Sequence, residues 1–303
     1  MSGPRVSRLL GIDFGGTNVK AVVVEDRPGA DPTVVGSGAV PTRADEGPAV
    51  VIEQIIAAGR SLLARHGPVD AAGLGTPGAF DPAEGTIVMF PNFPGDWVNR
   101  PLRQPVAEAL GLPVTMINDA RALTLAEGTI GAGKGCGTIV CLTLGTGIGG
   151  GVMIDGKLVL GAEGRAGEVG HQIIEPDGPQ CGCGNRGCVE ALTKADVLAS
   201  LAGRETVEEV YRAAAQGDPR SIDAIERVAS YLGIALANMV TVLGPDRIII
   251  GGGIMSSGEQ VLGPIRRAVS RRVTWVPPET VSIVPAELGT MGGAIGAALA
   301  ARG

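Results

Sequence analysis

Residues 170–188, GHQIIEPDGPQCGCGNRGC, concentrate side chains that bind metals or react with one another. The whole chain has only five cysteines and two histidines, and four of these residues lie in this segment: His171, Cys181, Cys183 and Cys188. Three kinds of site use such residues, namely a disulfide, a redox-active thiol pair and a metal centre. Two carboxylates, Glu168 and Glu190, flank the segment, so the same site would also fix two acidic groups.

A metal centre explains the segment better than the two sulfur-based alternatives. Three clustered cysteines cannot all pair with one another, and the C-G-C spacing differs from the C-x-x-C of thioredoxin-like proteins. Three thiolates and one imidazole form a closed tetrahedral zinc site, which leaves no position for a catalytic water. The sequence therefore predicts a structural zinc ion that fixes the loop and directs Glu168 and Glu190 into a cleft, with free thiols as the alternative.

Three glycine-rich turns form the second group of candidate residues: DFGGTN at 13–18, LGTGIGGG at 144–151 and IIIGGGI at 248–254. Because glycine has no Cβ atom, such turns let backbone N–H groups approach phosphate oxygens. Any one of them could be an ordinary hairpin turn, but three in one chain favour a nucleotide held between two lobes. The third turn could place an adenosine flat against the backbone.

Other nucleotide-binding motifs are excluded. GTGIGG at 145–150 fits G-x-G-x-x-G, but β-prone GVMI follows where a dinucleotide-binding fold requires a helix. DFG at 13–15 lacks the H-R-D and A-P-E segments of protein kinases. The sequence also contains no G-x-x-x-x-G-K-[ST] motif, so it is not a P-loop enzyme.

Two aspartates lie where phosphate chemistry could use them. Asp13 precedes the first turn, where it could orient Mg²⁺ or its waters, or accept hydrogen bonds from the turn itself. Asn118 and Asp119 end a predicted strand and begin a helix, so either could be an ordinary N-cap. A carboxylate at the positive end of a helix stays ionised, which would suit a base that accepts a hydroxyl proton during phosphoryl transfer.

The elements that carry these residues alternate along the chain. Short β-branched runs are separated by helical patterns near 49–65, 102–110, 120–130, 195–202, 206–215, 221–243, 258–272 and 291–301. This alternation predicts an α/β fold with at least partly parallel sheets. Residues 11–26 and 141–156 share a strand, a glycine-rich turn and a second strand, which suggests two similar domains facing each other across a cleft.

Composition bounds the class of protein. A chain of 303 residues, 45% apolar and with a net charge of −6, predicts a soluble globular protein long enough for two domains. Nothing in this balance favours nucleic acid as a partner. No apolar stretch reaches the roughly 18 residues of a membrane span, and the N-terminus lacks a signal-peptide pattern. We therefore expect a cytoplasmic protein in a reducing compartment, where structural disulfides are rare.

In order along the chain, GIDFGGTNVK, NDARALTLAEG, LGTGIGGG, EVGH and CGCGNRGCVE resemble the ROK family (repressors, open reading frames, kinases). The resemblance extends from Gly11 to the C-terminal helix. Within the family, the chain is most similar to the bacterial ATP-dependent glucokinases. It implies an actin-like ATPase (ribonuclease H-like) fold with two α/β domains around a central cleft. The smaller domain would span residues 1–118, with a helix at about 291–303 packed back on it, and the larger one 119–290 with the zinc loop.

The resemblance also implies an activity and a set of roles. A cytoplasmic homodimer or homotetramer would transfer a phosphoryl group from Mg·ATP to the 6-hydroxyl of a hexose, glucose above all, in glycolysis. Asp119 would accept the hydroxyl proton, and His171 would use the ring edge that faces away from zinc. The sugar would contact Gly78, Asn92, Asn118, Asp119, Glu168, His171 and Glu190. The nucleotide would contact Asp13, Gly15, Gly16, Thr17, Gly145, Thr146, Gly147, Gly251, Gly252 and Gly253, with Mg²⁺ held by Asp13 through water.

Several alternatives stay open within this resemblance. A kinase for mannose, fructose or N-acetylmannosamine, or a polyphosphate-using glucokinase, would keep the same core, and a non-catalytic sugar sensor is a different class. The family's repressors carry a winged helix before the first phosphate motif, and with ten residues before Gly11 we expect no repressor of that architecture. Arg121 departs from the family pattern N-D-x-N-A-A. Arg121 is either a solvated helix residue or the partner of a nearby acid, or it is a cation near the acceptor site or the transferred phosphate.

Overall fold

The computed structural model describes residues 6–90, 93–277 and 280–302. The chain forms two compact units. Unit 1 consists of Met1–Gly131 together with Leu288–Gly303, and unit 2 consists of Ala132–Glu287. The backbone therefore leaves unit 1 once and returns to it near the C-terminus.

Unit 1 is built around a five-stranded mixed sheet and a separate strand pair. Its strands are β1 (Ser7–Phe14), β2 (Asn18–Asp26), β3 (Thr33–Pro41), β4 (Ala71–Thr76), β5 (Ala79–Asp81), β6 (Thr86–Met89) and β7 (Val114–Asn118). The sheet has the order β3-β2-β1-β4-β7, while β5 pairs only with β6. The first three strands form an antiparallel meander, and β1, β4 and β7 run parallel to one another.

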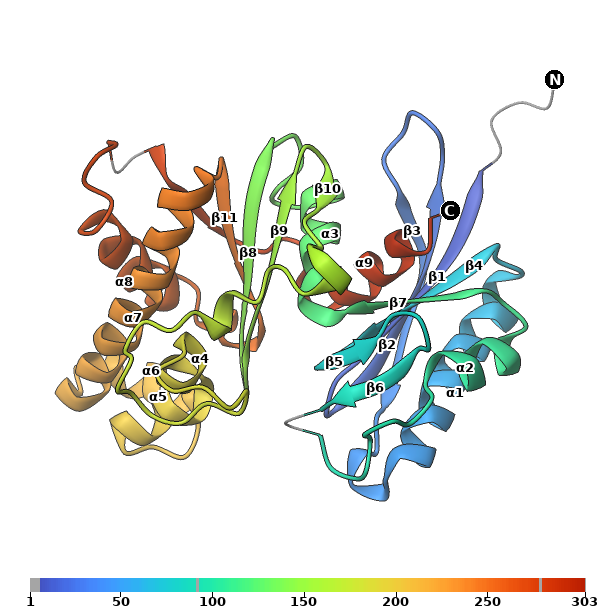
Figure 1. Ribbon diagram of the computed structural model, residues 1–303, viewed down its shortest axis with the longest axis horizontal. Coiled ribbons are helices and arrows are strands. Elements are labelled where there is room, and N and C mark those ends of the chain that lie inside the picture. Colours follow the sequence, from blue (N-terminus) through green and yellow to red (C-terminus); the bar gives the residue numbers. More distant parts are fainter. Residues whose placement is uncertain (1–5, 91–92, 278–279, 303) are drawn as a thin grey trace. The chain divides into compact units, whose positions relative to one another are not determined.

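Helices cover both faces of this sheet (Figure 1). They are α1 (Pro48–His66), α2 (Arg103–Leu110), α3 (Asp119–Ile130) and α9 (Gly292–Ala300), with single turns η1 (Ala44–Glu46) and η6 (Gly289–Met291). Successive side chains of a strand point to opposite faces. Leu10 and Ile12 of β1 accordingly pack with the core beneath α1 and α2, and Leu9 packs with α9 on the other face.

The approach of α9 to the sheet depends on glycines. A Cβ atom on Gly11 of β1 would lie 1.9 Å from the carbonyl oxygen of Ala294. A Cβ atom on Gly73 of β4 would lie 1.7 Å from the carbonyl oxygen of Ala297. Such distances are far below van der Waals contact, so only glycine lets the helix lie this close to the strands.

The boundary between the units differs from the expected one. We expected domains of 1–118 and 119–290, but the structure assigns α3 to unit 1, so the first crossing lies after Gly131. The physical reason is that α3 packs closely against α9: a Cβ atom on Gly296 would lie 1.7 Å from the carbonyl oxygen of Ala122. The C-terminal helix α9 packs on unit 1, and it holds α3 there.

Unit 2 repeats the sheet of unit 1. Its strands are β8 (Thr138–Leu144), β9 (Ile148–Ile154), β10 (Lys157–Leu158), β11 (Arg247–Gly251) and β12 (Ser282–Pro285). Their order, β10-β9-β8-β11-β12, matches that of unit 1 strand for strand, with an antiparallel meander followed by parallel strands. The short sequence similarity between 11–26 and 141–156 therefore reflects two domains of the same topology.

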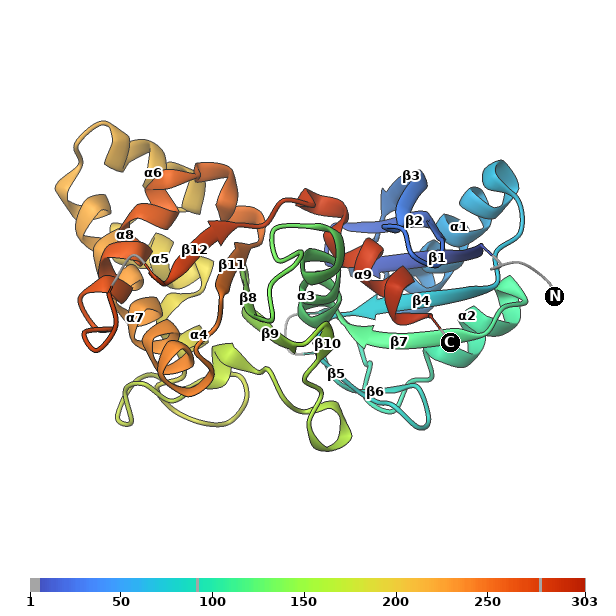
Figure 2. The ribbon, with the colours of Figure 1, turned by 90° about the horizontal axis from the view of Figure 1, so that it is seen from above.

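The helices of unit 2 enclose one large apolar core. They are α4 (Val189–Thr193), α5 (Ala195–Ala202), α6 (Val207–Ala215), α7 (Pro219–Leu243) and α8 (Glu259–Ser270), with the turns η2 (Ala162–Gly164), η3 (Val169–His171) and η4 (Gly253–Ser257). Figure 2 shows α5, α6, α7 and α8 gathered beside β11 and β12. All eight predicted helices are present, with ends within two residues of the expected ones.

Helix α7 is the one helix among the described residues that is long and apolar enough to cross a membrane, judged by length and composition. It begins with Pro219 after an Asp218 cap, whose Oδ2 accepts a hydrogen bond from the Ser221 backbone N–H at 3.0 Å. Ala235 and Leu236 are fully buried, and the helix packs against α5 and α8. In this structure α7 is a core helix of unit 2.

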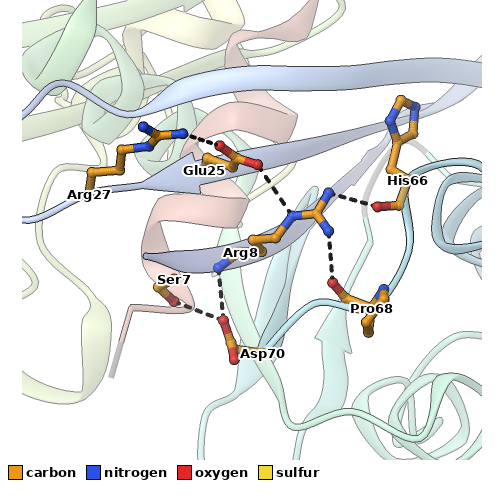
Figure 3. A network of polar contacts seen from close by, with 7 residues as sticks. All are labelled: Ser7, Arg8, Glu25, Arg27, His66, Pro68 and Asp70. Atoms are coloured by element: carbon orange, nitrogen blue, oxygen red, sulfur yellow. Dashed lines mark hydrogen bonds and ion pairs between the residues drawn. The ribbon is translucent and has the colours of Figure 1, made fainter. Parts of the chain in front are cut away.

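A polar network ties the connection between α1 and β4 to the first strand (Figure 3). The Arg8 guanidinium donates hydrogen bonds to the carbonyl oxygens of His66, at 2.7 Å, and Pro68, at 3.3 Å. Its Nε lies 3.6 Å from a Glu25 carboxylate oxygen, and Asp70 accepts a hydrogen bond from the Arg8 backbone N–H at 2.8 Å. These contacts fix the start of β4, whose end carries part of the candidate site.

Candidate functional site

The four residues of the predicted metal centre converge in unit 2. One ligand atom from each of them can be chosen so that all lie within 4.8 Å of one another: His171, Cys181, Cys183 and Cys188. The Sγ of Cys181 lies 3.7 Å from Nδ1 of His171, and the Sγ atoms of Cys183 and Cys188 are also 3.7 Å apart. All five cysteines are free thiols, so the disulfide interpretation is excluded.

The chemistry of this donor set fits zinc. Burial, together with hydrogen bonds to Cys183 and Cys181, raises the pKa of the Cys188 thiol to about 12. Burial also raises the pKa of Cys181, whereas at Cys183 hydrogen bonds, including one to the Asn185 backbone, outweigh burial and lower the pKa. Three thiolates this close repel one another, so holding all of them ionised requires a cation. A tetrahedral zinc ion with three sulfur ligands and one nitrogen ligand meets this requirement.

The local fold explains why the thiolates converge. Tight turns at Gly184 and Gly187, both with positive φ, reverse the chain between the cysteines. Gly187 also packs directly on the backbone, because a Cβ atom there would lie 1.5 Å from the carbonyl oxygen of Glu175. The Cys181 backbone N–H donates to the Asn185 carbonyl oxygen at 2.8 Å, which closes the loop.

Glu190 connects the metal cluster to the second glycine-rich turn. Its Oε1 lies 3.8 Å from the Sγ of Cys181, and its Oε2 accepts a hydrogen bond from the Ile148 backbone N–H at 2.9 Å. Ile148 is the first residue after the turn that contains Gly145. The structure therefore brings Glu190, His171 and this turn together, although α4, which carries Glu190, is too short to have been predicted from helical periodicity.

Glu168 and His171 share the single turn η3. Glu168 is the exposed N-cap of this turn and His171 is its last residue, with its backbone N–H 3.0 Å from the Glu168 carbonyl oxygen. Gly170 seats the turn on β9, since a Cβ atom there would lie 2.0 Å from the Ile148 carbonyl oxygen. Nδ1 of His171 faces the cysteines, so Nε2 is the ring atom left for another partner.

Several glycines of the phosphate turns have no structural reason to be glycine. Gly15, Gly16, Gly145 and Gly253 do not adopt positive φ, and a Cβ atom on any of them would meet nothing within 4 Å. Gly252 is different, because its φ is +98° and a Cβ atom would lie 2.2 Å from the Leu144 carbonyl oxygen. Open space beside side-chain-free backbone is the geometry that phosphate binding by turns requires.

The first two glycine-rich turns, at 13–18 and 144–151, are each held by contacts within their own unit. The Thr42 hydroxyl donates to the Gly15 carbonyl oxygen at 2.6 Å, and the Thr42 N–H donates to the Thr17 carbonyl oxygen at 2.9 Å. In unit 2, the Ala195 N–H donates to the Gly145 carbonyl oxygen at 2.9 Å. Thr42 is fully buried and was missed by the sequence analysis, because no motif marks a residue that supports a turn 25 positions away.

Asp13 lies at the end of β1, paired across the sheet with Lys20 on one side and Gly75 on the other. Its pKa is raised to about 7, first by burial and then by the negative charge of Asp119, against the opposing charge of Lys20. Two carboxylates close to a phosphate turn supply the oxygen ligands that Mg²⁺ prefers. A divalent cation at this position would favour the ionised form of Asp13.

The structure separates the roles of Asn118 and Asp119. Asn118 is the N-cap of α3, and its Oδ1 accepts hydrogen bonds from the backbone N–H groups of Ala120, at 3.1 Å, and Arg121, at 3.3 Å. Asp119 is the first helical residue, with Oδ1 2.8 Å from the Ala120 backbone nitrogen. Both side chains therefore accept a hydrogen bond from the Ala120 N–H, and only Asn118 reaches the Arg121 N–H as well.

Asn118 also contacts one of the other predicted sugar-binding segments. Its Nδ2 donates to the Gly78 carbonyl oxygen at 3.3 Å. Gly78 has a φ of +69°, and a Cβ atom there would lie 2.1 Å from the Met89 carbonyl oxygen, so glycine is required by the backbone itself. Asn92, the remaining predicted residue of this group, lies outside the described residues.

An aromatic cluster supports the segment that follows Gly78. Although aromatic residues make up only 3% of the chain, four of them pack together: Phe14, Phe90, Phe93 and Trp97. The ring centroids of Phe90 and Trp97 are 4.9 Å apart, and those of Phe14 and Phe93 are 5.8 Å apart. Because Phe14 immediately precedes Gly15, the cluster links the first glycine-rich turn to Phe90, Phe93 and Trp97.

Arg121 is buried, with 9% of its surface exposed. The interpretation of Arg121 as a solvated helix residue is therefore wrong, because its position in the first turn of α3 faces the protein interior.

The predicted site residues form two groups. Asp13, Gly78, Asn118 and Asp119 belong to unit 1, and Glu168, His171 and Glu190 belong to unit 2.

The sequence and the structure are both similar to those of known sugar kinases. The chain is 35% identical to the glucokinase of Thermotoga maritima over 315 residues, which cover 96% of each chain. A ROK family glucokinase from Streptomyces griseus, solved in complex with glucose and AMPPNP, is 34% identical and superposes with a TM-score of 0.83 over 98% of this chain and 99% of that one. The ROK hexokinase from Thermus thermophilus is 35% identical, with a TM-score of 0.81 and 97% of each chain covered.

These likenesses confirm the predicted fold, an actin-like ATPase fold of two ribonuclease H-like α/β domains, whose repeated sheet order was described above. The match to the ROK family extends over residues 9–303. It includes every motif from the first phosphate turn through the cysteine loop to α9. The chain therefore belongs to the ROK family.

Proposed function

We propose that this protein is an ATP-dependent hexose kinase that converts glucose to glucose 6-phosphate. The observation that carries this proposal is the Asp119 carboxylate in the first turn of α3, whose negative charge contributes to the raised pKa of Asp13. In this proposal Asp119 is the base and the turn at 15–17 binds phosphate. The glucokinases of Thermotoga maritima and Streptomyces griseus, which match over nearly their full length, support the same activity.

In the proposed reaction Asp119 accepts the proton of the sugar 6-hydroxyl. The hydroxyl oxygen forms a bond to the γ-phosphorus while the bond from that phosphorus to the β–γ bridging oxygen breaks, and ADP leaves. Positioning and charge neutralisation dominate such transfers, so a weakly basic carboxylate suffices. The partial positive charge of a helix N-terminus favours the ionised form of a carboxylate in the first turn. Mg²⁺, when bound with ATP near Asp13, neutralises charge on the phosphates.

The proposed substrate-binding residues are those that the family resemblance implies. Gly78, Asn92, Asn118, Glu168, His171 and Glu190 would contact sugar hydroxyls. Gly15, Gly16, Thr17, Gly145, Thr146 and Gly147 would surround the phosphates, and Gly251, Gly252 and Gly253 would receive the adenosine. Buried acceptors that read hydroxyl groups reject sugars that lack them, because the acceptor is then left unpaired.

Zinc would have a structural role in this enzyme. It would be held by His171, Cys181, Cys183 and Cys188, and would thereby fix His171 and the neighbouring Glu190. We further propose that the protein acts in glycolysis in the cytoplasm as a homodimer or homotetramer. The free state of all five cysteines is compatible with a reducing compartment.

The test is the release of ADP by purified protein with Mg·ATP in the presence of glucose, mannose, fructose, allose or N-acetylmannosamine. We expect the highest kcat/KM with glucose. Polyphosphate in place of ATP tests the second donor. A preference for another sugar would change the assigned substrate. If the folded, zinc-loaded protein phosphorylates none of these sugars, the result would contradict the kinase proposal and favour a non-catalytic sugar sensor.

Glu190→Gln should weaken glucose binding while leaving ATP binding nearly unchanged. Glutamine keeps an oxygen that can accept the Ile148 hydrogen bond, but it lacks the charge that strengthens bonds to sugar hydroxyls, which is worth about 1–2 kcal/mol. We therefore expect the KM for glucose to rise by about tenfold. Steady-state kinetics with each substrate varied in turn measures the change, and Glu175→Gln, at an exposed site of the same loop, is the control. A rise confined to the KM for ATP would contradict the assignment.

A further inference from the structure

The first turn of α9 lies directly against the Asp13 carboxyl group. A Cβ atom on Gly293 would lie 2.4 Å from Oδ2 and 2.7 Å from Cγ of Asp13. A Cβ atom on Gly75, the partner of Asp13 on the parallel strand β4, would lie 3.0 Å from Oδ1. The carboxylate is therefore confined by two residues that have no side chains.

Neither glycine is explained by its own backbone. Gly293 lies inside α9, where alanine is the better helix former, and neither Gly293 nor Gly75 has a positive φ. In addition, the nearest atom to a Cβ atom built on either glycine belongs to the Asp13 carboxylate. Glycine at these positions is thus selected by the neighbouring carboxylate and not by the helix or the strand.

The helix cannot withdraw to make room for a larger residue. Gly11 and Gly73 are in-register partners on β1 and β4, and they let α9 rest on the sheet at backbone distance, as described above. Asp13 follows Gly11 on the same face of β1. Because this packing fixes the depth of α9, a methyl group at position 293 would displace the Asp13 side chain before it displaced the helix.

We propose that Gly293 is a positioning residue of the nucleotide site, which holds the Asp13 carboxylate in the orientation that receives the Mg²⁺ ion of Mg·ATP. Gly75 acts in the same way from the β4 side, with a looser contact. This inference rests on the proposed kinase function. It assigns a role in substrate binding to Gly293 of the C-terminal helix, which lies about 280 positions after Asp13 in the sequence.

The test compares Gly293→Ala with Gly292→Ala, its neighbour on the same turn. The nearest atom to a Cβ atom on Gly292 would be Cδ1 of Leu123, at 2.4 Å, which is the flexible end of a side chain, and Cβ of Leu288 would follow at an ordinary contact distance of 3.5 Å. Binding of a non-hydrolysable ATP analogue is measured by calorimetry with and without Mg²⁺. We expect Gly293→Ala to lose at least about tenfold in affinity with Mg²⁺ and to keep its affinity without it. Gly292→Ala should behave as wild type, and Gly75→Ala should show a smaller loss of the same kind.

A second comparison shows whether the effect passes through Asp13. In an Asp13→Asn background, adding Gly293→Ala should cause no further loss of Mg²⁺-dependent affinity. An equal loss with and without Mg²⁺, or an undiminished loss in the Asp13→Asn background, would overturn the positioning role. If Gly293→Ala does not fold, Gly75→Ala decides by the same two measurements. Wild-type protein that binds the Mg²⁺-analogue complex but phosphorylates no sugar would refute the kinase proposal alone, because the titration still measures the role of Gly293.

Discussion

Asp119→Ala should lower kcat for glucose phosphorylation by about a thousandfold or more, because a positioned general base contributes about 10²–10⁴ in rate. Glucose should still bind. The remaining contacts belong to other residues, and the loss of one hydrogen bond to a charged group, worth about 1.5–3 kcal/mol, weakens binding by about ten- to a hundredfold. The measurements are kcat from single-turnover kinetics and the Kd for glucose from calorimetry. Asp119→Asn should give the same loss of rate with glucose affinity closer to wild type.

The effect must be separated from the loss of a charge at a helix end. Asp196 in the first turn of α5 provides a matched control, since its Oδ1 accepts a hydrogen bond from the next backbone N–H at 2.8 Å, as Asp119 does. Asp196→Ala should cost about 0.3–1 kcal/mol of stability and leave kcat unchanged. Asp119→Ala with normal turnover would remove its assignment as the base.

Cys188→Ser should abolish zinc binding and lower the free energy of unfolding by about 4 kcal/mol or more, because loss of a structural metal is among the few single changes with effects of this size. Cys188 is completely buried, so the variant also leaves a hydroxyl group in a site built for a thiolate. Metal content by mass spectrometry and denaturant unfolding measure the two effects. We expect one zinc ion per wild-type chain and none in the variant.

The same variant should also weaken glucose binding, because His171 and Glu190 lose the loop that fixes them. Cys136→Ser is the control, since Cys136 lies outside the cluster and is partly exposed. It should retain zinc, stability and glucose affinity. Wild-type protein freed of metal by a chelator, yet unchanged in melting and in glucose affinity, would show that the cluster is not a structural zinc site.

Local patterns were sufficient for most secondary structure. Helices of eight residues or more repeat an apolar stripe often enough to be recognised, and buried strands such as β8 and β11 are continuous runs of apolar residues. The strand β3 was missed, because two glycines interrupt its sequence and much of it is exposed. The helix α4 was missed because five residues do not complete a recognisable periodic pattern.

The sequence by itself identified the histidine and three cysteines that cluster, the three glycine-rich turns, and Asn118 and Asp119 at a helix start, because each is a short motif of residues a few positions apart. Tertiary structure alone decided which of Asn118 and Asp119 is the N-cap of α3, that α3 belongs to unit 1, and that Arg121 is buried. It also decided that Thr42, Gly75 and Gly293 support residues far away in sequence. The physical reason is that strand pairing and backbone-level helix packing bring these groups together, and neither leaves a signal in the local spacing of residues.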